Sequence, residues 1–369
     1  MNILCLDQFS ELGGAQRCLL DLLPALLACG WKAHVAAPGD GELGPRAIEC
    51  GATAGHIRLG PYSSGGKTAS DIMRFVREVP PLAREIECLI RRYDTDLVYV
   101  NGPRLLAPAA LATRKGPPVL FHSHSYVTGL SRRVAGWSLS ASLATVVAAC
   151  HFVAAPWEPY VHGRSARIVY NGVRTCAPVR STGPEPRIGV ISRIAPEKGQ
   201  ADFLRAARLI HRDLPECRFL ICGAPLFTTP EATRYAAGVK SLADDLPVTF
   251  TGWQRDVYGV LAGLDLLIVP SAAVDATPRV ILEAFAAGVP VVAFASGGIP
   301  ELIEHQVTGF LVEQASPKAL AWTVLNLLGR ERYKLAHVAE NARIKATTAF
   351  SLERYQAQML ESIEAARRI

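Results

Sequence analysis

Two carboxylates stand eight residues apart around the start of a predicted helix. Asp275 lies in the polar turn after an apolar run, and Glu283 lies more than one turn inside a helix that we expect to begin near Arg279. Pro278 fixes one φ angle and carries no N–H, so the helix would begin there with the free N–H groups of residues such as Val280. Such a helix end attracts anions. The two acids could hold hydroxyl groups at either end of a bound phosphate, and a surface helix with a chance acid is the alternative interpretation.

A pair of cations flanks a proline turn earlier in the chain. Arg193 and Lys198 lie in the loop 193–199, between a predicted strand over 187–192 and a helix. Two cations and a helix start could converge there on one diphosphate. Gly223 ends the next predicted strand with a turn. Exposed basic residues without any ligand are the alternative interpretation of the pair.

The first half of the chain offers a glycine loop and two histidines. Gly13 and Gly14 follow the first predicted strand, 2–6, and would let the backbone approach a ligand closely. A plain tight turn is the alternative. His122 and His124 follow another predicted strand, whose carboxyl end would point them into the crevice where ligands bind in open α/β sheets. Two satisfied polar groups without a catalytic role are again the alternative.

Strands that alternate with helices must position these residues. The alternation runs over 1–175, where it includes a predicted strand at 152–155, and restarts over 187–345, which indicates an α/β fold. The segment 175–186 is rich in proline and poor in apolar residues, so we place a domain boundary there. An amphipathic helix is predicted over 350–369. A chain of 369 residues needs two or three such domains.

The stretch 269–302 resembles the signature of the retaining glycosyltransferases of family 4, which have the GT-B fold. That signature is an acid, seven residues, Glu-Ala, a small-residue turn, Gly-x-Pro-Val and a later Gly-Gly-x-Pro-Glu. The matching residues are Asp275, Glu283-Ala284, Gly288-Val289-Pro290-Val291 and Gly297-Gly298-Ile299-Pro300-Glu301. The first acid is usually Glu, and Asp275 is shorter by one methylene. The loop 193–199 is similar to the family's Gly-Arg-x-x-x-x-Lys-Gly pattern, with Ser192 in place of the first Gly.

The resemblance implies two Rossmann-like domains that face a cleft. Residues 1–175 would bind the acceptor, 187–345 would bind a nucleotide-sugar, and the helix 350–369 would cross back to the first domain. The implied reaction is a metal-independent transfer of a sugar from a nucleoside-diphosphate sugar to a glycan, lipid-linked or small-molecule acceptor, with retention at the anomeric carbon. The donor is a substrate, and no further cofactor is expected. Polysaccharide biosynthesis is the implied setting.

The resemblance also assigns roles to single residues. The two cations of the loop 193–199 would stabilise the departing diphosphate, and Glu283 would accept hydrogen bonds from the ribose. Asp275 would hold sugar hydroxyl groups. His124 would contact the sugar or the phosphate, and it matches the family's histidine better than His122 does. The other residues expected to line the donor site are Gly13, Gly14, Gly223, Pro278, Arg279 and Val280.

Charge and cysteine usage limit the partners and the compartment. The net charge is +6 and the pI is about 8.9, without a basic stripe interleaved with aromatic residues, so we expect no nucleic-acid partner. Such a surface favours phosphates or anionic lipids, and we expect peripheral contact with the inner membrane. Nine cysteines without zinc-ligand spacing indicate thiols in a reducing cytoplasm. No secretion signal is recognised at the start of the sequence.

Two further motifs are interpreted as structural. Asp94-Thr95-Asp96 has the D-x-D form of a metal site, but it precedes a predicted strand, so we expect it to cap the strand entry and bind no metal. The loop 63–68 partly resembles a phosphate-binding loop. Pro61 stands where that pattern requires a glycine, so we do not interpret the loop as a phosphate site.

Two other functions stay open. A nucleotide-sugar epimerase of GT-B fold would need further acids and a histidine that act on the sugar ring. A catalytically silent nucleotide-sugar-binding protein is suggested only by the aspartate at 275. The residue types do not specify the donor base, the sugar or the acceptor.

Overall fold

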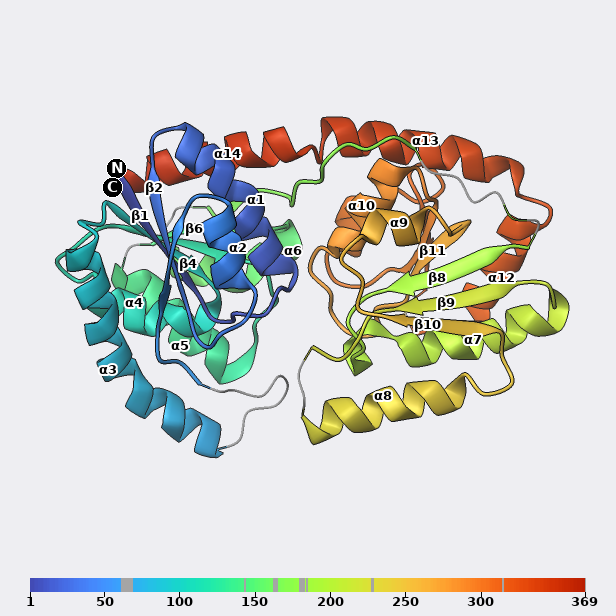
Figure 1. Ribbon diagram of the computed structural model, residues 1–369, viewed down its shortest axis with the longest axis horizontal. Helices are drawn as coiled ribbons and strands as arrows, with labels where there is room; N and C mark the ends of the chain where they lie inside the picture. Colours follow the sequence, from blue (N-terminus) through green and yellow to red (C-terminus); the bar gives the residue numbers. More distant parts are fainter. Residues whose placement is uncertain are drawn as a thin grey trace. The chain divides into compact units, whose positions relative to one another are not determined.

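The computed structural model describes residues 1–60, 69–142, 144–161, 165–178, 183, 185–226, 229–313 and 315–368. The chain divides into two compact units, which are coloured along the sequence in Figure 1. Unit 1 comprises Met1–Gly172 and Glu353–Ile369, and unit 2 comprises Val173–Leu352.

Unit 1 is built on a parallel sheet, whose described strands follow the order β3-β2-β1-β4-β5-β6-β7. The strands are β1 (Asn2–Asp7), β2 (Lys32–Ala37), β3 (Thr53–His56), β4 (Leu97–Asn101), β5 (Val119–Ser123), β6 (Thr145–Ala148) and β7 (Arg167–Ile168). The central strands are apolar runs buried along their length, as expected for a sheet covered on both faces. The strand order reverses between β1 and β4, and ligands bind at such a switch point in open α/β sheets.

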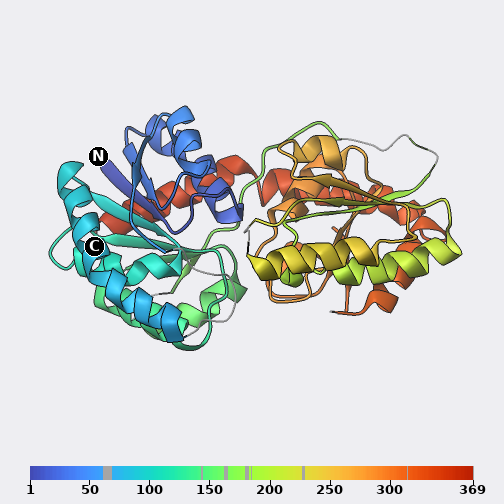
Figure 2. The ribbon, with the colours of Figure 1, turned by 60° about the horizontal axis from the view of Figure 1, so that its bottom comes forward.

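Helices cover both faces of this sheet. They are α1 (Gly14–Ala28), α2 (Leu43–Glu49), α3 (Ala69–Arg92), α4 (Leu106–Ala112), α5 (Gly129–Ser142), α6 (His151–Ala154) and α14 (Leu352–Arg367). Leu82 of α3, Leu106 of α4 and Leu139 of α5 share one buried cluster with Phe121 of β5, so these three helices cover the same face. Figures 1 and 2 show α14 on the opposite face. There Tyr355 of α14 is buried, and its hydroxyl donates a hydrogen bond of 2.9 Å to the carbonyl of Cys18 in α1.

Polar side chains form a layer between the sheet and the helices α1 and α14. The register pairs Asp7 of β1 with Asn101 of β4, and the Asn101 Nδ2 group donates to Asp7 Oδ2 at 2.5 Å. The Tyr99 hydroxyl lies 2.6 Å from His122 Nδ1 on β5. The His122 ring stacks at 6.5 Å, centroid to centroid, on Tyr355. Three strand ends and the last helix therefore share one buried polar layer.

Unit 2 has a second parallel sheet, whose described strands follow the order β10-β9-β8-β11-β12-β13. The strands are β8 (Arg187–Ile191), β9 (Arg218–Cys222), β10 (Val248–Gly252), β11 (Leu266–Val269), β12 (Val291–Phe294) and β13 (Phe310–Val312). The order reverses between β8 and β11. The loops after these two strands, 192–199 and 270–278, therefore leave the sheet at its switch point.

The helices of unit 2 include the one that the sequence predicts around Glu283. They are α7 (Gln200–Asp213), α8 (Pro230–Leu242), α9 (Val257–Leu261), α10 (Arg279–Ala287), α11 (Ile299–Leu302), α12 (Pro317–Leu328) and α13 (Tyr333–Thr348). The predicted start of α10 at Arg279, directly after Pro278, is confirmed. Gly288, with φ +73°, ends this helix in the left-handed conformation.

One predicted strand is wrong. The segment 152–155 is not a strand, because it forms α6 and the start of a 3-10 turn over Ala155–Tyr160. The strand of this region is β6, earlier in the chain. A short apolar run does not distinguish a strand from a buried helical segment, and Pro156 and Pro159 favour the turn.

The chain enters and leaves unit 2 through neighbouring segments. The N–H of Val173 donates to the Phe350 carbonyl at 2.9 Å, and the N–H of Leu352 donates to the Val173 carbonyl at 3.0 Å. Within the described ranges, none of the helices combines the length and the apolar character needed to cross a membrane.

Candidate active site

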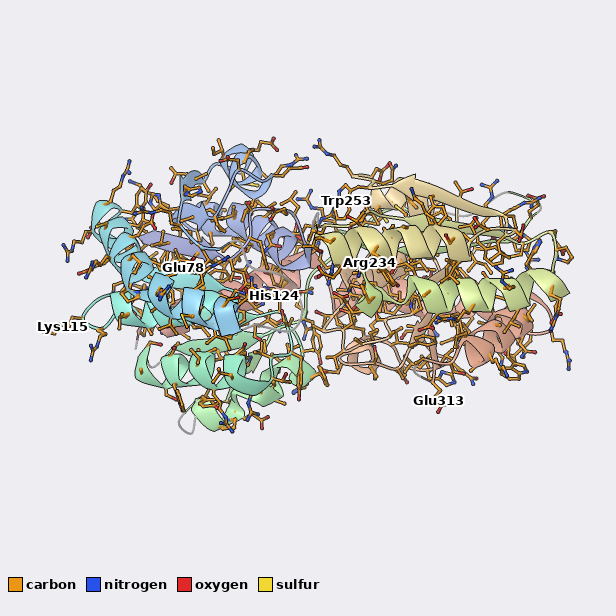
Figure 3. All side chains as sticks on the ribbon, turned by 90° about the horizontal axis from the view of Figure 1, so that it is seen from below. Glu78, Lys115, His124, Arg234, Trp253 and Glu313 are labelled. Atoms are coloured by element: carbon orange, nitrogen blue, oxygen red, sulfur yellow. The ribbon has the colours of Figure 1, made fainter. Side chains whose placement is uncertain are left out.

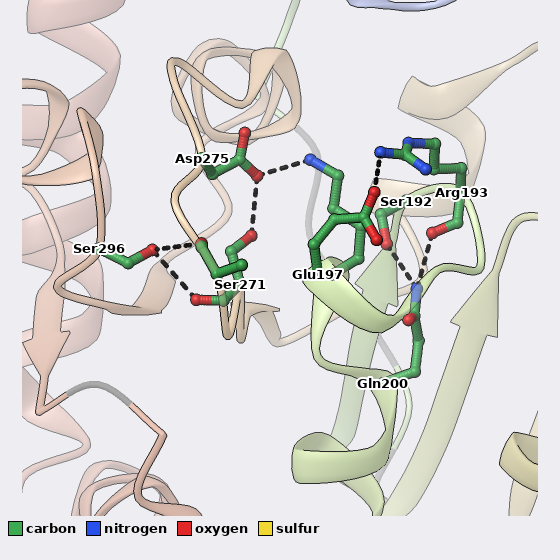
Figure 4. A network of polar contacts seen from close by, with 9 residues as sticks. Ser192, Arg193, Glu197, Gln200, Ser271, Asp275 and Ser296 are labelled. Carbon is green, nitrogen blue, oxygen red and sulfur yellow. Dashed lines mark hydrogen bonds and ion pairs between the residues drawn. The ribbon is translucent and has the colours of Figure 1, made fainter. Parts of the chain in front are cut away.

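Lys198 and Asp275 form an ion pair at the switch point of unit 2. The Lys198 Nζ atom lies 2.5 Å from Asp275 Oδ2, which also accepts a hydrogen bond of 2.8 Å from the Ser271 hydroxyl. Figure 4 shows this network, with Asp275 and Ser271 labelled. The loops after β8 and β11 thus meet through one predicted cation and one predicted acid.

Asp275 is ionised in this setting. Burial on its own would raise the pKa of Asp275. The Lys198 ammonium, the hydrogen bonds from Lys198 and Ser271, and the charge of Arg193 outweigh that effect and hold the pKa of Asp275 below its usual value. Asp275 is therefore a carboxylate at neutral pH.

Arg193, the second predicted cation, pairs with Glu197 one turn further on. The Arg193 guanidinium contacts the Glu197 carboxylate, and both side chains are about one-third exposed. Each of the two predicted cations therefore has a carboxylate partner.

Backbone contacts hold the same two loops together. The N–H of Ala272 donates to the Glu197 carbonyl at 3.1 Å. Gly199 has φ +71°, and a Cβ atom there would lie 1.7 Å from the Pro270 carbonyl oxygen. Only glycine therefore allows the turn that carries Lys198 to lie so close to the loop after β11.

The loop after β12 supports Asp275 from the other side. Gly297 has φ +57°, and a Cβ atom there would lie 2.0 Å from the Asp275 carbonyl oxygen. The N–H of Gly298 donates to that oxygen at 2.9 Å. The Ser296 hydroxyl donates to the Ser271 carbonyl at 3.0 Å. The Gly-Gly pair therefore fixes the backbone that carries the acid.

Gln200, which is fully buried, holds the backbone behind Arg193. Its Nε2 group donates to the Ser192 hydroxyl at 2.9 Å and to the Arg193 carbonyl at 2.8 Å. Its Oε1 atom accepts from the Tyr235 hydroxyl at 3.4 Å. Gly223 lies behind the same turn, since with φ +140° its Cβ would lie 1.9 Å from the Ser192 carbonyl oxygen. Gly223 therefore allows a close backbone approach beside Arg193.

Glu283 faces Arg279 across one turn of α10. The Arg279 Nε atom lies 4.0 Å from Glu283 Oε1, and both side chains are largely buried. The first N–H groups of a helix have no acceptor within that helix, so the turn from Arg279 and Val280 onward presents donors at the end that follows Pro278.

In unit 1, the glycine loop is tied to a buried carboxylate. The N–H of Gly13 donates to Gln16 Oε1 at 3.1 Å, and Gln16 Nε2 donates to Asp7 Oδ1 at 2.7 Å. Gly14 is the first residue of α1. Burial raises the pKa of Asp7 to about 7, although hydrogen bonds from the backbone and from Gln16 and Asn101 favour its charged form.

The two histidines at the end of β5 differ in exposure. His122 is completely buried, and burial together with the neighbouring His124 holds the pKa of His122 well below its usual value, so its ring is neutral. His124 lies one residue beyond the strand and is partly exposed, with its ring 3.8 Å from that of His122. Figure 3 labels His124 in unit 1. Of the two, His124 is therefore the one that a ligand could reach.

The D-x-D motif ties two strand starts together. Asp96 Oδ2 accepts from the N–H of Asn2 at 2.7 Å, and the Asp94 carbonyl accepts from the Asn2 side chain at 3.0 Å. The motif stands at the entry of β4, as expected, but its hydrogen bonds go to the start of β1. Among the described residues, no three His, Cys, Asp or Glu side chains are grouped as metal ligands. The loop 63–68 lies outside the described residues.

Family models match both halves of the chain. The one described as "Glycosyltransferase Family 4" matches residues 12–176, and the one described as "Glycosyl transferases group 1" matches residues 185–330. The chain belongs to the family 4 glycosyltransferases.

Curated relatives of this glycosyltransferase align over part of their length. The chain is 34% identical over 157 residues to a "GDP-mannose-dependent alpha-(1-6)-phosphatidylinositol monomannoside mannosyltransferase" of Mycobacterium tuberculosis, which covers 40% of this chain and 39% of that protein. It is 29% identical over 183 residues to the "Amylovoran biosynthesis glycosyltransferase AmsK" of Erwinia amylovora, with 48% of this chain and 44% of that protein covered. The chain thus spans less than half the length of these relatives.

Solved structures resemble the whole glycosyltransferase chain. HepE of Anabaena, in complex with UDP-glucose, is 25% identical with a TM-score of 0.83, over 99% of this chain and 100% of that chain. The sucrose-phosphate synthase of Thermosynechococcus elongatus is 18% identical with a TM-score of 0.79, over 98% of each chain. The predicted α/β fold of GT-B type is confirmed.

The structure of this glycosyltransferase brings together only part of the predicted site. In unit 2, Lys198 lies beside Asp275, while Gly223 lies behind the turn that carries Arg193. The predicted site residues Gly13, Gly14, His122 and His124 belong to unit 1, and their contacts are given within that unit. Sequence reasoning missed the supporting residues Glu197, Gln200, Ser271, Asp7 and Gln16. For Gln200 and Asp7 a signal existed, because each is a polar residue on an otherwise apolar face.

Proposed function

We propose that this family 4 glycosyltransferase moves a sugar from a nucleoside-diphosphate sugar to an acceptor hydroxyl group, with retention and without a metal. The observation that carries the proposal is the contact between Lys198 and Asp275, which joins a cation of the β8 loop to the loop that leads into α10. A cation and the amino end of a helix are thereby available to one diphosphate.

The charges of the site match those of the proposed transition state. Cleavage between the anomeric carbon and the diphosphate oxygen leaves negative charge on the leaving group and positive character on the sugar. Arg193, Lys198 and the first turn of α10 would stabilise the departing diphosphate. Asp275, held ionised, would bind sugar hydroxyl groups and favour the positive sugar. Glu283 would bind the ribose hydroxyl groups.

The ion pairs of Arg193 and Lys198 would prepare this site for the donor. Phosphate oxygens would take the place of the Glu197 carboxylate on Arg193 and share Lys198 with Asp275. Because the backbone behind Arg193 is fixed by Gln200, little rearrangement of that loop would accompany donor binding. Preorganised charge of this kind acts in the transition state at low reorganisation energy.

The acceptor would attack on the side from which the diphosphate leaves. We expect an ion-pair-like state, in which the departing diphosphate accepts the proton of the acceptor hydroxyl group while the new glycosidic bond forms. His124 would contact the donor sugar or its phosphate, and the loop of Gly13 and Gly14 would approach the donor with its backbone.

The names of similar proteins suggest the chemical class of the donor and of the acceptor. HepE is described with UDP-glucose, and the mycobacterial relative is named for GDP-mannose and a phosphatidylinositol mannoside. We propose a nucleoside-diphosphate hexose as the donor and a glycan or lipid-linked acceptor. The acceptor would be met in the cytoplasm or at the inner face of the membrane, in polysaccharide biosynthesis.

A donor screen followed by one substitution tests the proposal. A UDP-, GDP- or ADP-sugar that binds the folded protein raises its melting temperature, and the same donor should then support transfer or slow hydrolysis. Lys198→Ala should lower the turnover rate by about a hundredfold. Lys318→Ala, an exposed lysine on α12, is the matched control and should leave turnover unchanged. Unchanged turnover in purified Lys198→Ala protein would remove that residue from the mechanism.

The same incubation distinguishes the two alternatives. An epimerised donor sugar without transfer would indicate the epimerase. A melting shift without any product, with every donor and with added glycan or lipid-linked acceptors, would indicate a binding protein and contradict the proposed transfer.

A further inference from the structure

Two aromatic rings stack on each other near the end of β5 in unit 1. The Tyr126 ring lies 4.5 Å from the Phe152 ring, centroid to centroid, and the two planes are inclined by 27°. Phe152 covers one face of the Tyr126 ring, while 40% of Tyr126 is exposed. A tyrosine that is already stacked on one side presents an ordered apolar surface to a ligand, because little conformational freedom is left to lose on binding.

Two neighbouring strands place these rings at one edge of the sheet. The register pairs Ser123 of β5 with Ala148 of β6, so both strands end at the same level. Tyr126 follows Ser123 by three residues, and Phe152 of α6 follows Ala148 by four. The carboxyl ends of parallel strands form the ligand-binding edge of an open α/β sheet. The aromatic pair therefore lies at the edge of unit 1 where a substrate would bind.

A buried tryptophan anchors the backbone that carries the aromatic pair. The N–H of Ala149 donates to the Ser123 carbonyl at 3.1 Å, and Trp157 Nε1 donates to the Ser123 hydroxyl at 2.8 Å. Trp157 is completely buried, and its ring packs edge-on against Phe121 of β5. These contacts tie the end of β5 to the segment after β6. The two rings therefore stand on a fixed base.

The segments that carry the pair contain polar groups but no residue of fixed charge. Lysine, arginine, aspartate and glutamate are all absent from the sequence over 116–131 and over 134–157. Ser125 and His151 are exposed, and each stands next to one of the two aromatic residues in the sequence. A phosphate or carboxylate would find no lysine or arginine partner in these segments. An uncharged ligand with an apolar face and several hydroxyl groups matches them better.

We propose that Tyr126 and Phe152 bind a neutral pyranose ring of the acceptor. The C–H face of a pyranose is apolar and packs on an aromatic ring, while its hydroxyl groups remain at the rim for polar partners. The pyranose would stack on the exposed side of Tyr126, and Phe152 would hold the tyrosine ring in place. Ser125 and His151 would contact the hydroxyl groups.

The position of His124 favours the acceptor over the donor as the source of this sugar. His124, which the proposed function places at the donor sugar or its phosphate, stands two residues before Tyr126. An acceptor hydroxyl group must lie beside the donor sugar for transfer to occur. The acceptor role of the bound pyranose rests on the proposed function, whereas its binding to the two rings does not require transfer.

Saturation-transfer NMR with the full chain tests this proposal. The probes are the methyl pyranosides of glucose, galactose and mannose, and octyl glucopyranoside below its micellar concentration. The wild-type protein should bind at least one methyl pyranoside. Tyr126→Ala should weaken that binding about tenfold, and Tyr126→Phe, which keeps the aromatic face, should bind like the wild type. Wild-type protein that binds none of the probes, or the octyl glycoside alone, would overturn the proposal, because the rings would then not recognise the sugar.

A matched tyrosine in unit 2 controls for the general loss of an aromatic side chain. Tyr333, the first residue of α13, is 75% exposed. Tyr333→Ala should bind the methyl pyranoside like the wild type. Unchanged binding in Tyr126→Ala, or equal losses in Tyr126→Ala and Tyr333→Ala, would overturn the proposal. Tyr126→Trp provides a second test that keeps an aromatic ring in place, and it should bind at least as tightly as the wild type.

Donor binding separates this inference from the proposed function. The melting shift given by the nucleotide-sugar should be the same in Tyr126→Ala and in the wild type, which also shows that the variant is folded. A smaller donor shift with unchanged pyranoside binding would assign the rings to the donor and overturn the proposal. Pyranoside binding through Tyr126 without any donor shift or transfer would contradict the proposed function and support the sugar site. Transfer with an acceptor KM that Tyr126→Ala leaves unchanged would do the reverse.

Discussion

Asp7→Asn should change how the stability of unit 1 depends on pH. The carboxyl group of Asp7 is fully buried, and burial raises its pKa from the usual 3.8 to about 7. Because the folded protein holds the proton more tightly than the unfolded chain, Asp7 contributes stability that is fully present below about pH 3.8 and lost as the pH rises through about 7. The asparagine has no such proton, so this dependence should disappear.

The hydrogen bonds around Asp7 can accommodate the amide. Asn Oδ1 can accept from the N–H of Phe9 and from Gln16 Nε2, as Asp7 Oδ1 does. The new NH₂ group would face Asn101 Nδ2. Asn101 Oδ1 is buried and has no hydrogen-bond partner among the described residues, so rotation of the Asn101 amide provides an acceptor. This rotation removes the weak bond from Asn101 to the Ala15 carbonyl, which costs about 1 kcal/mol.

The magnitude follows from the two pKa values. Between about pH 5 and pH 8, ionisation of Asp7 should lower the wild-type free energy of unfolding by about 2.5 kcal/mol relative to the variant. Guanidinium unfolding, followed by the fluorescence of the buried Trp157, measures this difference at both pH values. The exposed Asp40→Asn is the control and should follow the wild type. Parallel curves for the wild type and Asp7→Asn would refute the reasoning.

Three further substitutions, two of them paired with a control variant, probe unit 2. Gly199→Ala should destabilise the protein by at least about 2 kcal/mol, since its Cβ would overlap the Pro270 carbonyl at positive φ. Gly238→Ala, with open space around the new Cβ inside α8, should instead be neutral or stabilising by about 0.5 kcal/mol in the same melting experiment. Gln200→Leu should weaken donor binding more than Tyr235→Phe does, because only the Gln200 substitution removes the hydrogen bond to the Arg193 carbonyl. Titration calorimetry measures both affinities, and equal values would contradict this prediction. The Glu197→Gln protein should bind the nucleoside diphosphate about fivefold more tightly, because the substitution removes the negative charge that competes with phosphate for Arg193. Weaker binding would contradict this prediction and would show that the Glu197 carboxylate is needed to position the guanidinium.

The parts of the fold that depend on local pattern are predictable from the sequence. Pro278 marks the start of α10, because a proline without an N–H suits the position before the first helical turn. The alternation of apolar runs with helices gives two α/β sheets. The strand predicted over 152–155 is wrong because its short apolar run is compatible with the helix α6 as well as with a strand.

The pairing within the site could not be predicted. Lys198 and Asp275 are far apart in the sequence, and their contact depends on β8 and β11 being neighbours in the sheet. The resemblance to a family supplies the residue types, but it does not show that Glu197 already binds Arg193. The choice between His122 and His124 likewise depends on burial, which the sequence of β5 does not distinguish.

The last helix has a consequence for biosynthesis. Unit 1 is completed by Glu353–Ile369, and Tyr355 closes the polar layer over His122. The ribosome must therefore synthesise all of Val173–Leu352 after the first 172 residues and before Glu353, which takes about 10 to 40 seconds at about 5 to 20 residues per second. During that interval unit 1 lacks the helix α14, and unit 2 can fold before unit 1 is complete. Chaperones would meet the chain in this half-finished form.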